Sequence, residues 1–517
     1  MSTASTLAPA PGAAFAAAVR AILAGRPGVL FYREEAQPHA PAFAAVEPWV
    51  VASIHAEKLC WREFDGSAPD GRRFETPLPA AAAFDLLQTL WSALPAAQPA
   101  QPERTLEDAV GGGLPRIPVW FTYELGEWLE PAALRNRVGA GAGAAPGLGR
   151  DASALAGFLI PRAIFRADGQ LVRDAESIGL RLQQCFHAWL RATSSRFAPT
   201  AAATVAAAAA VEKDRARGET PGFSGETLAP ADPTATRAGF LSAVERVQEY
   251  IGAGDVYQVN VTRRERHRTR GGPAAAGRLF ETILRRHPAR LASFWNAVDA
   301  DPVAGVQSFL SFTPERLLSA TPDIEGGWRL TSNPIKGTRA RPVGISPAAE
   351  ARLAAGLMAD PKEQAELNMI VDMARNDLSR IRGARRVRVE TSGRIDRLPF
   401  VLHRVAEVTA QTPTRPELSD LLHAVFPAAS ITGAPKIRAM QIIRELEPTP
   451  RGMYCGALGW LGDGFQCDLA LAIRTLETRR LEGRLESCFG VGAGIVADSQ
   501  PEREWQETRA KARGIVD

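Results

Sequence analysis

The chain has 517 residues, of which 45% are hydrophobic and 23% are charged, a composition typical of globular proteins. This length exceeds that of an ordinary single domain, and the composition excludes a largely disordered, collagenous or fibrous chain. The 61 basic and 57 acidic residues leave a net charge of +4, too small to indicate nucleic acid as an obligate partner.

The sequence carries no signal for a membrane or for export. No stretch is apolar over the length of a membrane span, and the Ala-rich N-terminus has no basic segment before its apolar run. The five cysteines are odd in number and include no CxxC pair, which is typical of free thiols in a reducing compartment. We therefore expect a cytoplasmic protein with no membrane or nucleic-acid partner.

The predicted elements divide the chain into three parts. Residues 1–135 mix short strands, such as 28–32 and 118–123, with Ala- and Leu-rich helical stretches, which indicates an N-terminal half-domain. Residues 136–236 form an insertion or linker: structure is predicted only at 153–195, and 196–236 is rich in Ala, Thr, Pro and Gly. An Ala-rich helix is the alternative there.

Residues 237–517 form the third part and carry most of the patterns. In chain order they predict a helix at 239–255, a strand at 256–268, a loop at 332–341, a long helix near 347–380, a strand at 385–395, a helix beginning within 430–440, strands at 454–462 and 467–483, and a C-terminal helix. Strands and helices do not alternate regularly, so an α+β fold is favoured over a doubly wound parallel sheet.

Lysine is rare in this chain, which makes each one notable. Only six of the 61 basic residues are lysine, and Lys336 stands in the segment PIKGT between proline and glycine. Arginine keeps its proton in proteins, whereas a desolvated lysine can act as a nucleophile or base. Lys336 is therefore a candidate nucleophile or, if buried beside carboxylates, one partner of an ion pair.

Two predicted helices each place a pair of glutamates on one face. Glu363 and Glu366 are three residues apart in the helix 361–381, and Glu504 and Glu507 are three apart near the C-terminus, with Lys511 four residues further. If the two faces meet, up to four carboxylates gather, and a cation such as Mg²⁺ is the natural occupant. Ordinary surface ion pairs are the alternative for each helix alone.

Two glycine-containing segments could bind an anion. Thr432 and Gly433 precede Pro435 at the predicted start of a helix, whose N–H groups favour a carboxylate. The segment GVGAGIVAD at 490–498 contains Gly492 and Gly494, where a ligand could approach the backbone closely. An arginine near such backbone sites, such as Arg474, is either a ligand-binding or a structural residue.

Glu315 is a candidate general acid. It follows Pro314 at the end of a predicted strand, where partial burial would raise its pKa. An ion pair with Arg316 or another arginine is the alternative. His403 lies in a β-like run and is as readily explained by packing as by chemistry.

Taken together, these segments resemble the chorismate-utilising enzymes, a family that includes anthranilate synthase component I, aminodeoxychorismate synthase component I, isochorismate synthase and salicylate synthase. The resemblance spans roughly residues 237–517, with WFTYELGEWLE (120–130) as a counterpart in the first half. The segments that carry it occur in family order and are GDVYQVNVTRR (254–264), SFTPERLL (311–318), PIKGTRAR (334–341), KEQAELNMIVDMARNDLSRI (362–381), FPAASITGAPKIRAMQIIRELEP (426–448), RGMYCGALGWL (451–461), LAIRTL (471–476) and GVGAGIVADSQPEREWQETRAKA (490–512).

The resemblance implies large mixed or antiparallel sheets packed with helices, and a site that binds chorismate with Mg²⁺. It implies that Glu366 and Glu507 hold the metal, with Glu363 and Glu504 beside them, and that Glu315 protonates the departing C4 hydroxyl. The residues that it implies for binding the substrate, mainly through its carboxylates, are Gln258, Thr432, Arg474, Gly492, Gly494 and Lys511.

Two positions favour one branch of the family. Members that add water at C2 carry a lysine where this chain has Gln258, and a neutral amide cannot activate that water. Anthranilate synthases usually have alanine where this chain has Lys336, whereas aminodeoxychorismate synthases have lysine. The resemblance therefore implies aminodeoxychorismate synthase component I, in which this amine forms a covalent adduct at C2 and 4-amino-4-deoxychorismate is made for p-aminobenzoate and folate synthesis. Anthranilate synthase component I is the alternative.

The source of ammonia follows from the cysteines. None of the five stands in a Gly-x-Cys-x-Gly turn of the kind that holds a glutaminase nucleophile. We therefore expect ammonia to be delivered by a separate glutamine amidotransferase subunit.

Overall fold

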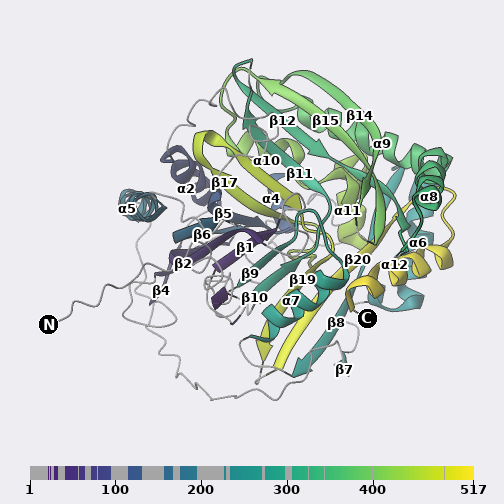
Figure 1. Cartoon of the computed structure of the whole chain (residues 1–517), viewed down its shortest axis with the longest axis horizontal. Coiled ribbons are helices and arrows are strands. Elements are labelled where there is room, and N and C mark those ends of the chain that lie inside the picture. The colour runs from purple at the N-terminus through teal and green to yellow at the C-terminus, as the bar shows by residue number, and fades with distance from the viewer. Residues whose placement is uncertain are drawn as a thin grey trace, which may run out of the picture.

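The structure is a computed structural model of the whole chain (Figure 1). It describes residues 21–22, 24, 28–32, 41–55, 58–63, 72–77, 80–94, 115–130, 156–166, 175–194, 226–228, 233–270, 274–296, 306–323, 325–342, 344–398, 400–481 and 484–516. Within the predicted insertion or linker at 136–236, residues 136–155 and most of 196–236 lie outside these residues.

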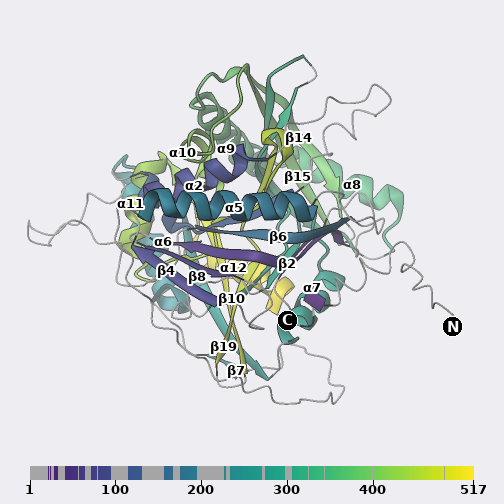
Figure 2. The same cartoon turned by 90° about the vertical axis from the view of Figure 1, so that its left-hand side faces the viewer.

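The first part of the chain is a group of strands flanked by helices. Its strands are β1 (Gly28–Tyr32), β2 (Pro41–Ile54), β3 (Lys58–Glu63), β4 (Arg72–Pro77), β5 (Pro115–Phe121) and β6 (Ala156–Arg166). Its helices are α2 (Ala80–Ser92), α4 (Glu124–Leu129) and α5 (Ala175–Ser194). Long strand β2 pairs with β1, β3 and β6, and Figure 2 shows α5 and α2 lying across this group of strands.

The second part contains longer strands and most of the helices. Its strands are β7 (Glu226–Thr227), β8 (Gln258–Arg270), β9 (Ser293–Asn296), β10 (Val306–Ser311), β11 (Arg316–Pro322), β12 (Trp328–Asn333), β13 (Ile335–Ala340), β14 (Arg385–Arg397), β15 (Val401–Thr412), β16 (Gly433–Ala434), β17 (Ala457–Gly462), β18 (Cys467–Leu471), β19 (Thr475–Leu481) and β20 (Arg484–Ile495). Its α-helices are α6 (Arg237–Gly252), α7 (Ala275–Arg286), α8 (Pro347–Ala359), α9 (Pro361–Ser379), α10 (Leu418–Val425), α11 (Lys436–Leu446) and α12 (Pro501–Val516), and its short 3₁₀ turns are η2 (Pro233–Ala235), η3 (Ala429–Ile431) and η4 (Asp463–Phe465).

The strands of the two parts are hydrogen-bonded to one another. β1 pairs with β9, and β5 pairs with β17 over most of its length. Every strand pairing within the described residues is antiparallel, which confirms the predicted α+β class with large antiparallel sheets. The proposed boundaries at 135 and 237 stay a prediction, since the pairings join strands from both sides of them.

Two pairs of strands and three helices surround the region in which most of the candidate site residues lie. β8 pairs with β20 from Arg270 to Val259, and β13 pairs with β15. Helix α9 packs on β13, β14 and β15, while α12 packs on β20 and α6. Figure 1 shows α9 and α12 on the same side of the molecule, with β20 running past α12.

The structure corrects two sequence predictions. The predicted long helix near 347–380 is two helices, because the Asp360 side chain accepts hydrogen bonds from the Lys362 and Glu363 N–H groups and Pro361 starts a new helix. The predicted loop at 332–341 is largely strand β13, since pairing with β15 over residues far apart in sequence overrides its proline and glycine.

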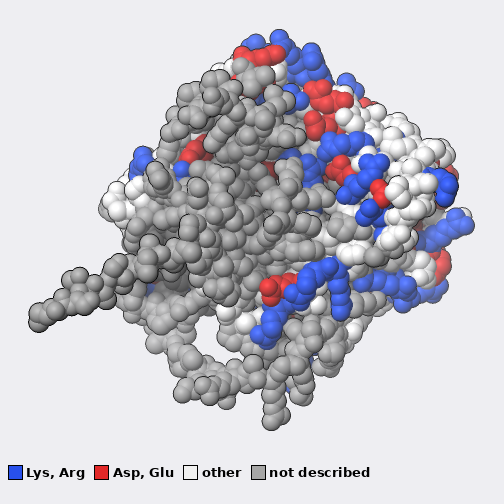
Figure 3. All heavy atoms as spheres, viewed as in Figure 1, with Lys and Arg blue, Asp and Glu red and all other residues white. Residues whose placement is uncertain are grey.

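The core and the surface agree with the composition. The largest core cluster contains Trp91, Phe121, Phe158, Phe240 and Phe426, which come from both parts of the chain. On the face shown in Figure 3, basic and acidic side chains of the described residues are interspersed. All five cysteines are free. Among the described residues, no helix combines the length and apolar character needed to cross a membrane.

Candidate active site

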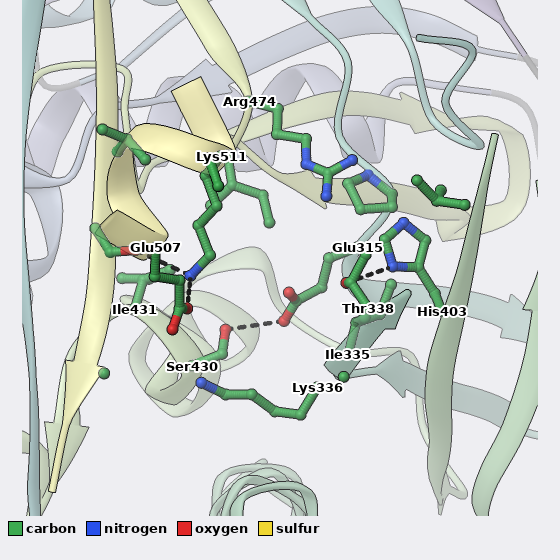
Figure 4. A pocket seen from close by; sticks show the side chains of 18 of the residues that line it. Glu315, Ile335, Lys336, Thr338, His403, Ser430, Ile431, Arg474, Glu507 and Lys511 are labelled. Carbon is green, nitrogen blue, oxygen red and sulfur yellow. Dashed lines mark hydrogen bonds and ion pairs between the residues drawn. The ribbon is translucent and has the colours of Figure 1, made fainter. Parts of the chain in front are cut away.

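A cavity of about 660 Å³ opens between β8, β13 and β20 and helices α9 and α12. The candidate residues that line it are Glu315, Lys336, Glu363, Glu366, Arg474, Gly492, Gly494, Glu504, Glu507 and Lys511. Figure 4 shows Glu507 and Lys511 projecting from α12 on one side, Arg474 and His403 on the other, and Glu315 between them. The structure therefore brings together side chains from segments more than 190 residues apart in sequence.

Lys336 reaches the cavity from strand β13. Its side chain is 17% exposed, and its Nζ lies 3.6 Å from Glu366 Oε2. A Cβ atom added to Gly494 would lie 3.5 Å from the same Nζ, so the amine lies directly against the glycine-rich strand β20. Lys336 is thus a mostly buried amine held beside a carboxylate, as one of its two sequence interpretations predicted.

Glu315 lies in the turn between β10 and β11. It is 6% exposed, its Oε1 accepts a hydrogen bond of 2.8 Å from the Ser430 hydroxyl, and its backbone carbonyl accepts one from Leu471 N–H. Burial raises the pKa of Glu315 to about 7, although the Ser430 hydrogen bond and the Lys336 charge both act to lower it. A carboxyl group with this pKa can hold a proton near neutral pH and donate it. The alternative ion pair with Arg316 is wrong, because Arg316 pairs with Asp468.

The four glutamates of α9 and α12 face the same cavity. Burial raises the pKa of Glu363, and the neighbouring Glu366 carboxylate adds to that rise. Burial also raises the pKa of Glu504, partly offset by the hydrogen bond of 2.8 Å from Ser499. For Glu507, burial acts to raise the pKa, but the charges of Lys511 at 2.6 Å, Lys336 and Lys362 together lower it. The glutamates of both helices thus line one cavity, which is the arrangement that the sequence analysis required for a cation site.

Carboxylates can hold Mg²⁺, but in this structure lysines pair with Glu366 and Glu507, and Arg339 lies 3.5 Å from Glu363. Lys336 and Lys362 lie 3.6 and 3.7 Å from the two Glu366 oxygens, and Lys511 pairs with Glu507. Within the described chain, no three His, Cys, Asp or Glu side chains form a group that could hold an ion. Mg²⁺ usually takes only one or two protein carboxylates and keeps several waters, so the absence of a larger group does not decide against Glu366 and Glu507, which stay the predicted ligands.

The other end of the cavity is cationic. The backbone around Arg474 has a φ of 49°, and burial lowers the pKa of its guanidinium. No hydrogen bond or ion pair to this side chain occurs within the residues that the structure describes. A partly buried guanidinium that faces a cavity without a carboxylate partner suits an anionic ligand.

His403 also lines this end of the cavity. The sequence analysis explained this residue equally well by packing and by a chemical role. Its Nδ1 lies 2.9 Å from the Thr338 hydroxyl, whereas its Nε2 is buried without a hydrogen-bond partner. Burial and then the Arg474 charge lower the pKa of His403 to about 3, so the imidazole is neutral. It can therefore offer one unpaired nitrogen to a ligand.

A side chain at Gly492 or Gly494 of β20 would collide with atoms of the neighbouring strand β8. A Cβ at Gly492 would lie 2.8 Å from the Val261 carbonyl, and one at Gly494 would lie 3.0 Å from Gln258 Nε2. The Gly492 carbonyl accepts a hydrogen bond of 3.1 Å from Lys511 Nζ. Lys511 therefore joins α12 to this strand through Gly492 while also pairing with Glu507.

Two candidate residues do not line the cavity. Thr432 is fully buried, and its hydroxyl donates a hydrogen bond of 2.9 Å to the Ala428 carbonyl, so the structure does not offer it to a ligand. Gln258 is 1% exposed and lies behind Gly494, with neither amide atom hydrogen-bonded. Helix α11 starts only at Lys436, which pairs with Asp377, so the predicted helix N-terminus does not face the cavity.

Sequence reasoning missed Ser430 and Asn260, which both line the cavity. Ser430 stands two residues before the selected Thr432, and Asn260 stands two residues after Gln258, on the same face of strand β8. The alternation along β8 was a usable signal for Asn260. No local pattern identifies Ser430, because its partner Glu315 lies 115 residues away.

Comparisons with known proteins place the chain in a family. The family of chorismate binding enzymes matches residues 80–517. The chain is 37% identical over 285 residues to anthranilate synthase component 1 of Aquifex aeolicus, covering 54% of this chain and 53% of the relative. It is 36% identical over 277 residues to aminodeoxychorismate synthase component 1 of Bacillus subtilis, covering 54% of both. The matched part thus spans about half the length of these curated relatives.

A solved structure supports the same fold. The crystal structure of anthranilate synthase component I from Streptococcus pneumoniae has a TM-score of 0.58 and 22% identity to this chain, covering 94% of this chain and 92% of that one. At this identity the likeness concerns the fold alone, and the family match carries the assignment. Since that match extends over most of the chain and includes every residue that lines the cavity, the chain belongs to the chorismate binding enzyme family.

Proposed function

We propose that this chain is component I of an aminodeoxychorismate synthase, which converts chorismate and ammonia into 4-amino-4-deoxychorismate for p-aminobenzoate and folate synthesis. The relatives bear the names of both this enzyme and anthranilate synthase at nearly equal identity, so identity favours neither branch. The observation that carries the proposal is the placement of the Lys336 amine inside the cavity that also holds Glu315.

The two ends of the cavity complement a dicarboxylate. Arg474 presents a partly buried guanidinium without a carboxylate partner at one end, and the carboxylates with their lysines lie at the other. One carboxylate of chorismate would bind Arg474, and the other would approach the end formed by α9 and α12. Glu366 and Glu507 would hold Mg²⁺ there; when bound, this ion would neutralise the glutamates, accept a substrate carboxylate and compete with Lys336 for Glu366.

The proposed reaction uses Glu315 as acid and Lys336 as nucleophile. In its neutral form, Lys336 bonds to C2 as the ring double bond shifts and the C4 hydroxyl leaves as water with the proton of Glu315. Ammonia then bonds to C4, the double bond shifts back, and the bond between C2 and Lys336 breaks. The net change is replacement of the C4 hydroxyl by an amino group with release of water, and no redox partner is needed.

The partner and location follow the same proposal. A separate glutamine amidotransferase subunit would deliver ammonia, with free ammonia as a slower substitute. The cytoplasmic location stays a prediction.

Anthranilate synthase component I is the second candidate, favoured by the similarity to the Aquifex aeolicus protein. It would place the amino group at C2 and release pyruvate.

The product separates the two candidates. The chain is incubated with chorismate, ammonia and Mg²⁺, and the product is identified by mass spectrometry and by the fluorescence of anthranilate. We expect 4-amino-4-deoxychorismate from the unaltered chain, and a loss of at least 100-fold in its formation by Lys336→Ala. Arg375→Ala, on an exposed part of α9 outside the cavity, is the matched control and should retain full activity. Anthranilate with pyruvate as the product, or unchanged C4 amination by Lys336→Ala, would contradict the proposal.

A further inference from the structure

A buried ion pair lies behind the cavity wall, outside the groups that the reaction uses. Arg451 is 2% exposed and Glu447 is 7% exposed. Arg451 Nε donates to Glu447 Oε2 over 2.7 Å, and its Nη2 donates to Glu447 Oε1 over 2.8 Å. Neither residue lines the cavity. Burying such a pair is justified only when its remaining donors and acceptors are also satisfied.

The remaining donors of Arg451 hold two pieces of the wall. Its Nη1 donates to the Ile431 carbonyl over 2.7 Å, and its Nη2 donates to the Asn260 carbonyl over 2.8 Å. Ile431 and Asn260 both line the cavity, one in the turn η3 and the other in strand β8. The guanidinium also stacks on the Tyr123 ring at 4.7 Å, which closes its other side to solvent.

Glu447 completes the same connection. Its Oε1 accepts a hydrogen bond of 2.9 Å from Thr262 N–H, two residues along β8 from Asn260. The pair thus fixes the strand β8 and the turn η3 relative to each other. Asn260 N–H also donates to the Thr432 carbonyl over 2.8 Å, so Ile431 and the residue after it are both held.

We propose that Arg451, with Glu447, is a positioning residue that holds Ser430 against Glu315 from behind the wall. Ser430 directly precedes Ile431, whose carbonyl Arg451 binds, and it donates to Glu315 over 2.8 Å. A guanidinium with a fixed fork of donors is suited to hold a carboxylate and two carbonyls at once. The inference rests on the proposed function, since it assigns Glu315 the role of acid.

Other groups around Glu315 must be considered in a test by pH. Lys336 faces it from β13, and Arg474 and His403 line the same cavity. On its other side, Glu315 and Asp377 of α9 line a second cavity of about 30 Å³, and Asp377 is paired with Lys436. None of these groups contacts Arg451 or Glu447, so a change in the pair reaches Glu315 through η3.

The test measures the pH dependence of kcat/KM for C4 amination at a fixed concentration of neutral ammonia. Activity should fall as the pH rises through the pKa of Glu315, because the acid loses its proton. The Ser430 hydroxyl stabilises the ionised carboxylate, so Ser430→Ala should move this decline upward by about 1 pH unit. The double variant Arg451→Met with Glu447→Met removes the pair without leaving an unpaired charge. It should move the decline in the same direction and lower kcat about tenfold or more.

Combination and control variants make the test specific. Adding Ser430→Ala to the double variant should move the decline no further, because both changes remove the same hydrogen bond. Arg438→Met, on α11, breaks a half-exposed ion pair with Asp255 and should leave the pH at which kcat/KM falls unchanged. If the double variant does not fold, as judged by circular dichroism, Glu447→Gln retains an oxygen acceptor and should produce a smaller upward movement.

The outcomes separate this inference from the proposed function. A folded Arg451 variant whose kcat/KM falls at the same pH as that of the unaltered protein would overturn the positioning role, even if Ser430→Ala moves this fall to higher pH. An additive movement in the combined variant would also overturn that role. C4 amination without a decline at alkaline pH, or C4 amination retained by Glu315→Gln, would remove the acid assignment and the positioning role with it but leave the proposed overall reaction in place. Anthranilate as the product would instead remove the proposed function.

Discussion

Replacing Glu315 by glutamine should change both the chemistry and the pH dependence of stability. The carboxyl group is buried, and burial raises its pKa from an ordinary value of 4.5 to about 7. Glutamine retains the size of the side chain and can still accept a hydrogen bond from Ser430, but it has no proton to donate to a leaving hydroxyl. The variant therefore separates the acid from the shape of the site.

The magnitude follows from the difference between the folded and unfolded pKa. The folded protein binds this proton more tightly than the unfolded chain does, so the stabilising effect of protonation is complete below pH 4.5 and is lost as the pH rises through 7. A difference of roughly 2.5 pH units corresponds to about 3 kcal/mol of unfolding free energy. Relative to the glutamine variant, the unaltered protein should lose about this much stability between acid and alkaline pH.

The assay compares urea unfolding of the two proteins at several values from about pH 4 to about pH 8. The stability difference between Glu315→Gln and the unaltered chain should grow in favour of the variant as the pH rises. In parallel, C4 amination by the variant should fall by about 100- to 10,000-fold, the usual contribution of a general acid. Glu325→Gln, at a side chain 64% exposed, is the control and should show neither effect.

Either of two results would refute this reasoning. A stability difference that does not vary with pH would mean that the carboxyl group is not protonated in the folded protein near neutral pH. Retained amination would mean that another group, or water, supplies the proton.

Two further predictions concern the walls of the cavity. Gly494→Ala would place a methyl group 3.0 Å from Gln258 Nε2 and 3.5 Å from Lys336 Nζ, and should lower kcat/KM for amination at least tenfold; Gly252→Ala, with no atom within 4 Å of the added Cβ, should be neutral. Removing Mg²⁺ with a chelator should abolish amination, and Glu366→Gln should raise the Mg²⁺ concentration needed for half-maximal rate at least tenfold. The control Asp372→Asn, at a side chain 72% exposed, should not change this concentration. Equal Mg²⁺ requirements in the two variants would argue against Glu366 as a ligand.

Much of the site could be predicted because its residues share local patterns. Glutamates three apart on a helix share a face whatever surrounds them, so the pairs on α9 and α12 were visible in the sequence. A proline directly before Glu315 and glycines along β20 likewise mark their positions. Residues selected for such reasons line one cavity in the folded chain.

What could not be predicted depends on contacts between distant segments. The pairing of β13 with β15 turned a proline- and glycine-flanked loop into a strand, and such pairing has no local signal. The Thr432 hydroxyl donates to the Ala428 carbonyl in its own turn, so it is not available to the ligand that the sequence analysis predicted for it. The partners of Arg451 come from four separate segments of the chain, so its environment becomes visible only in the fold.

The distribution of lysine connects the composition to the chemistry. Of the six lysines in the chain, Lys336, Lys362 and Lys511 line the cavity, although arginine supplies nearly all other positive charges. An ammonium can pair with the glutamates of α9 and α12, yield its place to a metal ion, and release its proton; a guanidinium cannot do the last of these. Arg474, at the end proposed to bind a permanent carboxylate, has no need to titrate. The cavity therefore places a lysine, Lys336, where the proposed reaction needs an amine that can lose its proton. Its arginines, Arg474 and the Glu363 partner Arg339, stand where the charge need not change.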